Sequence, residues 1–96
     1  MRNRFLVAYD IMDPDRLRIM RRTMLGFGDP LQYSVFLCEL SPKERAIMVS
    51  TLSDVIRPSE DRVLIVDLGP VGGKGDECME FLGRPHEIED RGSTIV

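Results

Sequence analysis

One aspartate and a group of arginines carry most of the chemistry that this sequence offers. Asp10 ends a segment whose two faces are otherwise apolar, so burial in a strand does not account for it. The chain has two cysteines and one histidine, too few for a zinc site with four thiolates or with two cysteines and two histidines. The same counts disfavour Ser-His-Asp and Cys-His catalysis. Any chemistry must therefore use carboxylates, arginines or a bound metal ion.

The charge is unevenly placed along the chain. Residues 1–25 contain six arginines and three aspartates, a net charge of +3, whereas residues 54–96 contain five basic and ten acidic residues, a net charge of −5. A protein that coats nucleic acid alone is normally basic throughout. This chain offers only a local basic surface. Its affinity for nucleic acid would be low and salt-sensitive unless a dimer or a partner adds positive charge.

Strands and helices alternate around these residues. The β-branched and aromatic content predicts strands over residues 4–11, 31–40 and 62–68. Asp13 and Ser41, each followed by proline, predict the starts of two helices. A chain of 96 residues with this alternation predicts one domain of the α/β or α+β class.

The nearest template is a ferredoxin-like βαββαβ sandwich, an α+β fold. It needs two strands between the helices, yet residues 31–40 show no hairpin turn. Either that segment bends sharply at a bulge or the template is wrong. We expect a core over residues 1–68. A tail over residues 69–96 would join a glycine-rich connection to short strands at 78–82 and 93–96, which we expect to pack on the partner subunit of a dimer.

Two helices cover one face of a sheet, but both faces of the strand at 62–68 are apolar. Leu64 and Val66 oppose Val63 and Ile65. An uncovered apolar face usually marks a partner surface, and a symmetric homodimer is the simplest partner. The alternative is that the tail folds back over this face.

The location can be predicted from what the sequence lacks. No apolar stretch approaches the roughly 20 residues of a transmembrane helix, and the first residues run directly into a strand without room for a signal peptide. Cys38 and Cys78 fall in apolar segments and are interpreted as core residues in a reducing cytoplasm. We expect a cytoplasmic protein without membrane contact.

An ordered set of motifs resembles the CRISPR-associated Cas2 family, the small partner of the Cas1 integrase. These motifs are VAYDI at 7–11, DPDRLR at 13–18, GFG at 26–28 and LQYSVF at 31–36, followed by Cys38. The likeness extends through Leu68, and residues 80–83 resemble the next strand of the family. It implies a prokaryotic ferredoxin-like homodimer in which the first strands lie near one another. An Asp10 pair at the dimer axis would hold one Mg²⁺ or Mn²⁺ per dimer.

The resemblance also assigns roles to single residues. Asp10 matches the metal-binding aspartate and would be catalytic. Five further residues match positions of the family motifs: Tyr9, Arg16, Arg18, Ser34 and Phe36. Together with Arg21 and Arg22, the other two arginines of the first helix, they are the residues that we expect to contact nucleic acid. Pro30 and Leu37 depart from the family, which commonly has arginine and glutamate there, and this weakens the expectation of efficient hydrolysis.

Each role has a structural alternative. Asp10 would then end its strand and hydrogen-bond amides of the following turn, and the arginines would form a solvated face paired with Asp13 and Asp15. Tyr9, Tyr33 and Phe36 are able to stack on bases, but single aromatics in strands more often belong to the core. The acidic tail would meet a basic integrase surface, or would only keep the protein soluble.

Family members are described in two ways, and both functions remain open. In the first, which we favour, the homodimer is an adaptor that holds duplex DNA between integrase dimers during spacer acquisition. In the second, it is a metal-dependent endonuclease acting on single-stranded RNA or duplex DNA. A small toxin-like ribonuclease on the same fold is a third alternative.

Overall fold

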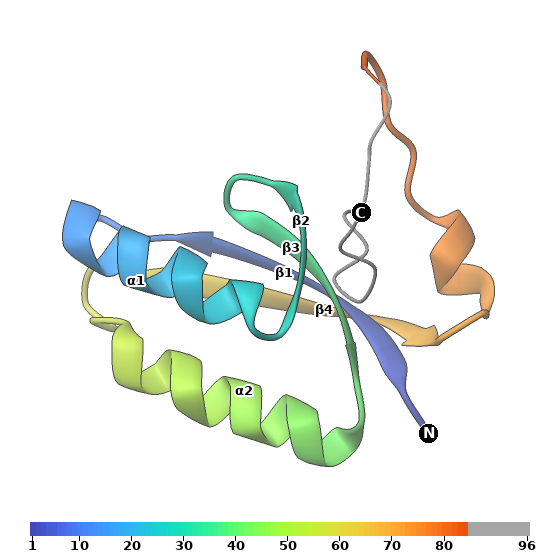
Figure 1. Cartoon of the computed structure of the whole chain (residues 1–96), viewed down its shortest axis with the longest axis horizontal. Helices are drawn as coiled ribbons and strands as arrows, with labels where there is room; N and C mark the ends of the chain where they lie inside the picture. Colours follow the sequence, from blue (N-terminus) through green and yellow to red (C-terminus); the bar gives the residue numbers. More distant parts are fainter. Residues whose placement is uncertain (85–96) are drawn as a thin grey trace, which may run out of the picture.

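The computed structural model describes residues 1–84, in which two helices cover one face of a four-stranded antiparallel sheet (Figure 1). The strand order across the sheet is β2-β3-β1-β4. This βαββαβ order confirms the predicted ferredoxin-like α+β fold. The elements are β1 Asn3–Asp10, α1 Pro14–Leu25, β2 Gly28–Gln32, β3 Val35–Leu40, α2 Pro42–Val55, β4 Arg62–Pro70 and the short 3-10 helix η1 Lys74–Glu77.

Both helices begin where the capping signals predict. The Asp13 carboxylate accepts a hydrogen bond from Arg16 N at 2.9 Å. Ser41 Oγ accepts from Glu44 N at 3.1 Å, and Glu44 Oε1 accepts from Ser41 N at 2.8 Å. These bonds satisfy amides that have no partner within the first helical turn. The first cap also fixes the direction in which α1 leaves the end of β1, where Asp10 lies.

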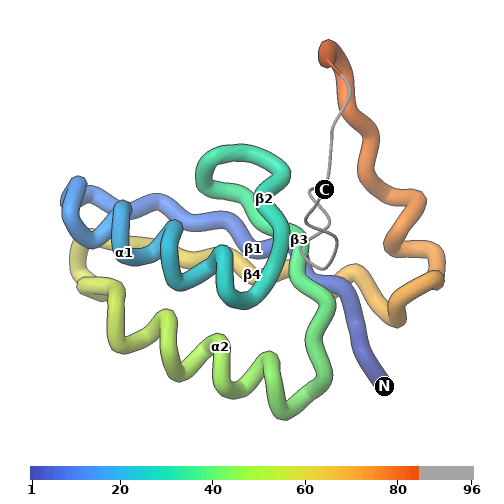
Figure 2. Tube along the Cα trace, in the orientation of Figure 1, coloured from blue at the N-terminus to red at the C-terminus, as the bar shows by residue number. Residues whose placement is uncertain are grey.

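The segment expected as one strand over residues 31–40 bends sharply into a hairpin, so the first of the two alternatives holds and the ferredoxin-like template stands. Tyr33 and Ser34 form the turn between β2 and β3, which Figure 2 traces beside α1. Neither residue is the glycine, asparagine or aspartate that two-residue turns favour, so the sequence gives no turn signal there. The hairpin supplies the second strand that the ferredoxin-like template requires.

β2 begins earlier than expected, at Gly28, in a segment that the sequence presents only as the end of a helix. A Cβ atom at this position would lie 2.5 Å from the carbonyl oxygen of Leu37 and 2.6 Å from Cys38 Sγ. Glycine is therefore required by the close approach of the two strands. Pro30 follows within β2, and an edge strand tolerates a proline because its outer side needs no ladder hydrogen bond.

The core lies between the helices and the face of the sheet that they cover. Its strand residues include Phe5, Val7, Tyr9, Phe36 and Cys38, which pack with Met20 and Met24 of α1 and Met48 and Leu52 of α2. Cys38 is buried as predicted. Cys78 is exposed, so its interpretation as a core residue was wrong. It lies beyond η1, outside the two packed layers.

The opposite face of the sheet carries apolar side chains with no helix over them. Leu6 lies across from Val66, and Ala8 lies across from Leu64, in the antiparallel ladder of β1 and β4. Leu64 is 56% exposed. Among residues 1–84, the predicted apolar face is therefore left open by both α1 and α2.

The chain after β4 returns toward the start of β1. Val71 N donates to the carbonyl oxygen of Arg2 at 3.1 Å. The strand predicted over residues 78–82 is absent, since these residues form no ladder with the sheet of their own chain. Residues 78–81 instead line a groove of about 310 Å³ with part of the open face. The strand predicted at 93–96 lies outside the described residues, and packing of the tail on a partner subunit stays a prediction.

Candidate nucleic-acid interface

Asp10 is the last residue of β1 and its side chain is exposed. It lies on the uncovered face, opposite Arg62 in the register with β4. Within residues 1–84 its carboxylate takes part in no hydrogen bond or ion pair. The following turn is held by other groups, since Met12 N donates to Asp61 Oδ1 at 3.0 Å. Stabilising that turn is therefore not the role of Asp10.

Asp61 is the carboxylate that holds this corner together. Its side chain is fully buried and accepts hydrogen bonds from two backbone amides, Met12 N and Arg57 N at 2.8 Å. It also accepts from Arg16 Nε at 2.8 Å and Arg16 Nη2 at 3.2 Å. The hydrogen bond from Arg16 is the main reason that the pKa of Asp61 lies well below its usual range. The same contact raises the pKa of the Arg16 guanidinium.

The four arginines of α1 that were predicted to contact nucleic acid have different environments. Arg16 is held by Asp61 and by Glu60, whose Oε1 lies 2.9 Å from Arg16 Nη2. Arg18 is exposed and pairs with Asp15, itself exposed, and Arg22 is also exposed. Arg21 is half-buried and lies over aromatic rings. Arg18 and Arg22 are thus the two exposed arginines of α1, and of these only Arg18 is paired with a carboxylate among residues 1–84.

Tyr9 and Phe36, which were predicted to contact nucleic acid, lie in the core. Phe36 is 0% exposed and Tyr9 is 6% exposed. Their rings stack with centroids 6.1 Å apart, and burial raises the pKa of the Tyr9 hydroxyl. Neither ring offers a face to a base from solvent. Tyr33, the third aromatic of this region, is 60% exposed.

The β2–β3 turn is attached to the end of β1. Tyr9 N donates to the Ser34 carbonyl oxygen at 3.1 Å, and the Tyr9 hydroxyl donates to the Tyr33 carbonyl oxygen at 3.2 Å. Ser34 is half-buried. These bonds place the turn next to the residue that precedes Asp10, so the exposed carboxylate and the exposed tyrosine occupy the same end of the sheet.

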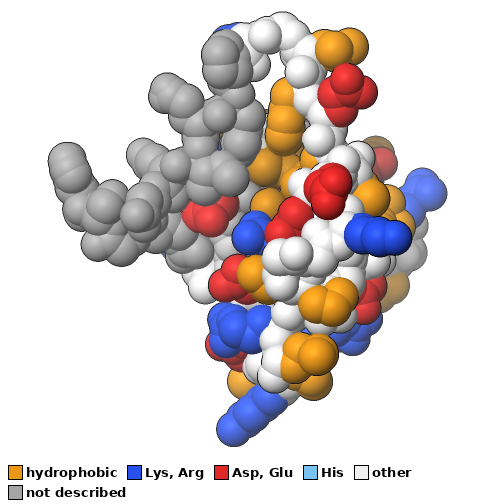
Figure 3. Space-filling view, turned by 90° about the vertical axis from the view of Figure 1, so that its right-hand side faces the viewer, with side chains coloured by type: hydrophobic (Ala, Val, Ile, Leu, Met, Phe, Trp, Pro, Cys, Tyr) orange, Lys and Arg blue, Asp and Glu red, His pale blue; other side chains and the backbone are white. Residues whose placement is uncertain are grey.

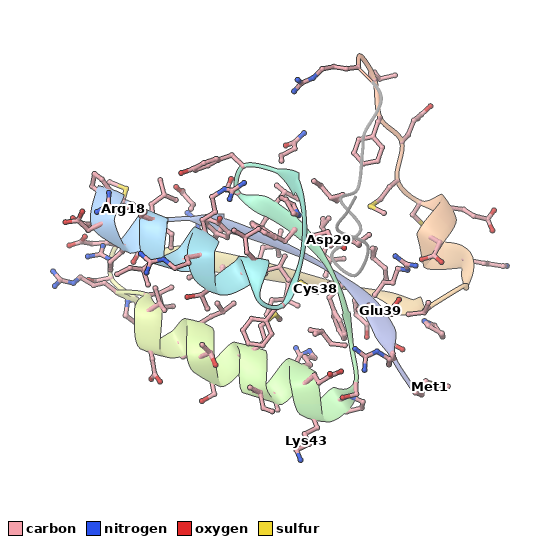
Figure 4. All side chains as sticks on the ribbon, viewed as in Figure 1. Met1, Arg18, Asp29, Cys38, Glu39 and Lys43 are labelled. Carbon is pink, nitrogen blue, oxygen red and sulfur yellow. The ribbon has the colours of Figure 1, made fainter. Side chains whose placement is uncertain are left out.

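The other end of the sheet contains a cleft of about 660 Å³ between β3 and the start of α2. Its arginines are already paired: Arg2 Nη1 lies 2.7 Å from Glu44 Oε1, and Arg4 Nε lies 2.7 Å from Asp76 Oδ1. Figure 3 shows acidic, basic and apolar side chains interleaved when the molecule is viewed from this side. Arg18 lies at the opposite end of the molecule from Met1 and Glu39 (Figure 4). The cleft therefore offers little free positive charge to a phosphate.

Residues 1–84 contain no group of three or more histidine, cysteine, aspartate or glutamate side chains able to hold a metal ion. None of their helices has the length and apolar character needed to cross a bilayer.

The fold and the site define a class: a small ferredoxin-like protein with a free carboxylate at a strand end and exposed arginines on the next helix. The chain matches the family described as CRISPR associated protein Cas2 over residues 3–71. A relative from Rhodospirillum rubrum, named CRISPR-associated endoribonuclease Cas2 1, is 41% identical over 92 residues, covering 96% of this chain and 89% of the relative. The chain therefore belongs to the Cas2 family, as the motifs indicate.

Other relatives agree with this assignment. The CRISPR-associated endoribonuclease Cas2 of Geobacter sulfurreducens is 41% identical over 70 residues, covering 73% of this chain and 74% of the relative. The crystal structure of Streptococcus pyogenes Cas2 at pH 6.5 superposes with a TM-score of 0.73 at 28% identity, covering 83% of this chain and 99% of that one. A hypothetical protein from Thermus thermophilus gives a TM-score of 0.75 at 26% identity, covering 93% and 100%.

Sequence reasoning did not identify Asp61, and it did not place Tyr33 among the predicted contact residues. No local signal marks Asp61, because its donors come from the β1–α1 turn, from α1 and from the residues that follow α2. Tyr33 was considered only as one of three aromatics with the same two interpretations. The turn at residues 33–34, had it been recognised, would have separated its exposed ring from the buried ones.

Proposed function

We propose that this chain is a homodimeric CRISPR adaptation protein that binds duplex DNA and bridges dimers of the Cas1 integrase during spacer acquisition. The observation that carries the proposal is the apolar face of the sheet that neither helix covers, which a second copy of the chain would bury, with Arg18 and Arg22 exposed on α1. Membership of the Cas2 family supports the same role. A cytoplasmic location in a prokaryotic cell belongs to this proposal.

The homodimer is supported by the open face. Burial of apolar surface is worth roughly 25 cal/mol per Å², and Leu6, Ala8, Leu64 and Val66 present such surface next to one another. Two copies packed through these faces bring their first strands together and place both Asp10 side chains near the two-fold axis. The Leu64→Asp variant should then be monomeric in sedimentation equilibrium. Ile47→Asp, which changes a residue of similar exposure on α2, should remain dimeric.

A Mg²⁺ or Mn²⁺ ion fits the donors of such a dimer better than those of one chain. Mg²⁺ binds through one or two carboxylates together with phosphate oxygens and water. A single Asp10 is an incomplete site, whereas two uncommitted Asp10 carboxylates supply that set, with one ion per dimer. When bound, the ion would polarise a phosphodiester and lower the pKa of a coordinated water.

A metal-dependent endonuclease acting on single-stranded RNA or duplex DNA is the second candidate. The names of the Rhodospirillum and Geobacter relatives favour an endoribonuclease. The free carboxylate of Asp10 is also what such chemistry needs. The substitutions at Pro30 and Leu37 remove a basic and an acidic group common in the family, which argues for the adaptor as the main role.

One comparison separates the two candidates. Cleavage of labelled single-stranded RNA and duplex DNA is measured for wild type and Asp10→Ala, with Mg²⁺ and with EDTA, alongside capture of DNA together with Cas1. An adaptor captures DNA in both forms, whereas a nuclease loses cleavage only in the variant and in EDTA. Asp54→Ala, which removes another exposed carboxylate, is the matched control. A chain that cleaves RNA but does not bind Cas1 would support the toxin-like alternative.

A further inference from the structure

Tyr33 is unusual among the aromatic residues at the Asp10 end of the sheet. It is 60% exposed, while its neighbours Tyr9 and Phe36 are buried. Its side chain stands at a two-residue turn, where small polar residues or glycine are the common choice. Neither burial nor turn formation explains a large ring at this position.

The ring of Tyr33 is held in place rather than loosely exposed. The Arg21 guanidinium carbon lies 5.0 Å from the centroid of the Tyr33 ring and 6.0 Å from that of Phe36. The backbone of Tyr33 is fixed by the hydrogen bond from the Tyr9 hydroxyl. A ring that is already ordered loses little conformational entropy when it binds a ligand.

The charge of Arg21 is not neutralised by a carboxylate in the described part of the chain. Its Nε is buried without a hydrogen-bond partner there, and its contacts are with the two rings. A cation over an aromatic ring is attracted by the electron density of the ring face, and it adds attraction for a polyanion close to the ring. Arg18 and Arg22 lie one turn or less away on α1 and are exposed; the partner of Arg18, Asp15, is itself exposed, and such surface pairs are weak.

We propose that Tyr33, supported by Arg21, is a stacking platform for one unpaired base, with Arg18 and Arg22 contacting the adjoining phosphates. The inference rests on the proposed function, because it needs nucleic acid at this end of the sheet. It adds the kind of nucleic acid: a strand with an unpaired nucleotide, such as the single-stranded overhang of a duplex. Aromatic stacking accepts any base, so the platform selects for an unpaired base and not for a sequence.

The test compares a blunt duplex with the same duplex carrying a short single-stranded overhang, by fluorescence anisotropy at one fixed salt concentration. Tyr33→Leu should weaken binding of the overhang duplex by roughly tenfold, within the range measured for loss of one base–aromatic stack. Binding of the blunt duplex should not change. Tyr33→Phe keeps a ring and should restore most of the lost affinity, and Ile47→Ala is a control on the exposed side of α2.

An overhang of abasic nucleotides gives the decisive readout. It keeps the phosphates but has no base, so wild type and Tyr33→Leu should bind it equally. An equal loss on all three ligands, or no loss on any, would overturn the platform while leaving the proposed function intact. If wild-type protein binds none of the duplexes, the proposed function fails and the platform fails with it.

Discussion

The two ends of β1 differ in whether their charged side chains are paired. At the end near the N-terminus, Arg2 and Arg4 each have a carboxylate oxygen 2.7 Å away, from Glu44 and Asp76. At the other end Asp10 has no such partner among residues 1–84. Paired charges neutralise one another, so Arg2 and Arg4 help to hold the chain together, whereas Asp10 keeps a carboxylate available for the role proposed above.

The free state of Asp10 depends on a second carboxylate nearby. Asp61 accepts the amide hydrogen of Met12 and binds Arg16, both of which follow Asp10 in the chain. It thereby performs the structural task that the strand-end aspartate would otherwise be expected to perform. The buried Asp61 thus has the structural role at this end, which leaves the exposed Asp10 for the functional role that we propose.

The largest expected effect is on stability, from Asp61→Ala. The change leaves two backbone amides and Arg16 Nε without their buried acceptor, which should lower the melting temperature by roughly 10 °C or more. Asp10→Ala, the matched control, should shift it by less than about 2 °C. Circular dichroism during heating measures both. Equal shifts in the two variants would contradict the division of roles.

The contribution of Asp61 should also depend on pH in a defined direction. Its pKa is lowered in the folded protein by the hydrogen bond from Arg16, so the unfolded chain takes up a proton first as the pH falls. The stabilisation is complete above the ordinary aspartate pKa of about 4 and is lost as the pH falls below it. Urea unfolding of wild type and Asp61→Asn at pH 7, 5, 3 and 2 should show a difference that shrinks only in acid. A constant difference would contradict this origin.

An intermediate effect is expected on nucleic-acid affinity, from the combined change Arg18→Gln and Arg22→Gln. Two lost phosphate contacts should reduce the slope of log affinity against log salt by about two and weaken binding several-fold at low salt. Lys43→Gln, at the start of α2 on the other side of the molecule, should leave the slope unchanged (Figure 4). Anisotropy titrations at four salt concentrations measure this slope. An unchanged slope in the double variant would show that the nucleic acid does not contact these two arginines.

The smallest effect is expected at the paired end. Arg4 and Asp76 are both partly exposed, and pairs of this kind contribute roughly 0–1 kcal/mol. Arg4→Gln should therefore change the melting temperature by only a few degrees and leave nucleic-acid affinity unaltered. A loss of affinity as large as that of the α1 variants would show that the two ends do not differ as described.

The parts of the fold that sequence predicts well depend on short distances along the chain. Asp13 and Ser41 cap their helices by accepting a hydrogen bond from the backbone amide three residues later. Their roles can therefore be predicted from the local sequence. The hairpin was missed because Tyr33 and Ser34 carry no turn signal and β2 starts inside an apparent helix stop. Without the position of that turn, the sequence could not show which aromatic ring is exposed and able to stack on a base and which rings are buried in the core.

The position of Asp10 at the end of an apolar strand was predicted from the sequence, and the contacts of the residues around it were predicted less well. Asp10 was identified because a charge follows an apolar strand, a pattern visible over ten residues. The partner of Arg16 is 45 residues away in the chain, and only the folded topology brings the two together. The sequence therefore left open whether Arg16 meets a phosphate or a carboxylate, and the structure places it against Asp61.

The contact at Gly28 has a consequence for how this chain can vary. Because the space for even one methyl group is taken by the backbone of Leu37 and the sulfur of Cys38, the first residue of the outer strand has no freedom to mutate. Shrinking Cys38 would not relieve the clash with the carbonyl oxygen of the backbone. In a library of folded variants, position 28 should therefore remain glycine even when its neighbours are substituted. The turn at residues 33–34, to which the same strand leads and where Tyr33 is exposed, should accept many substitutions.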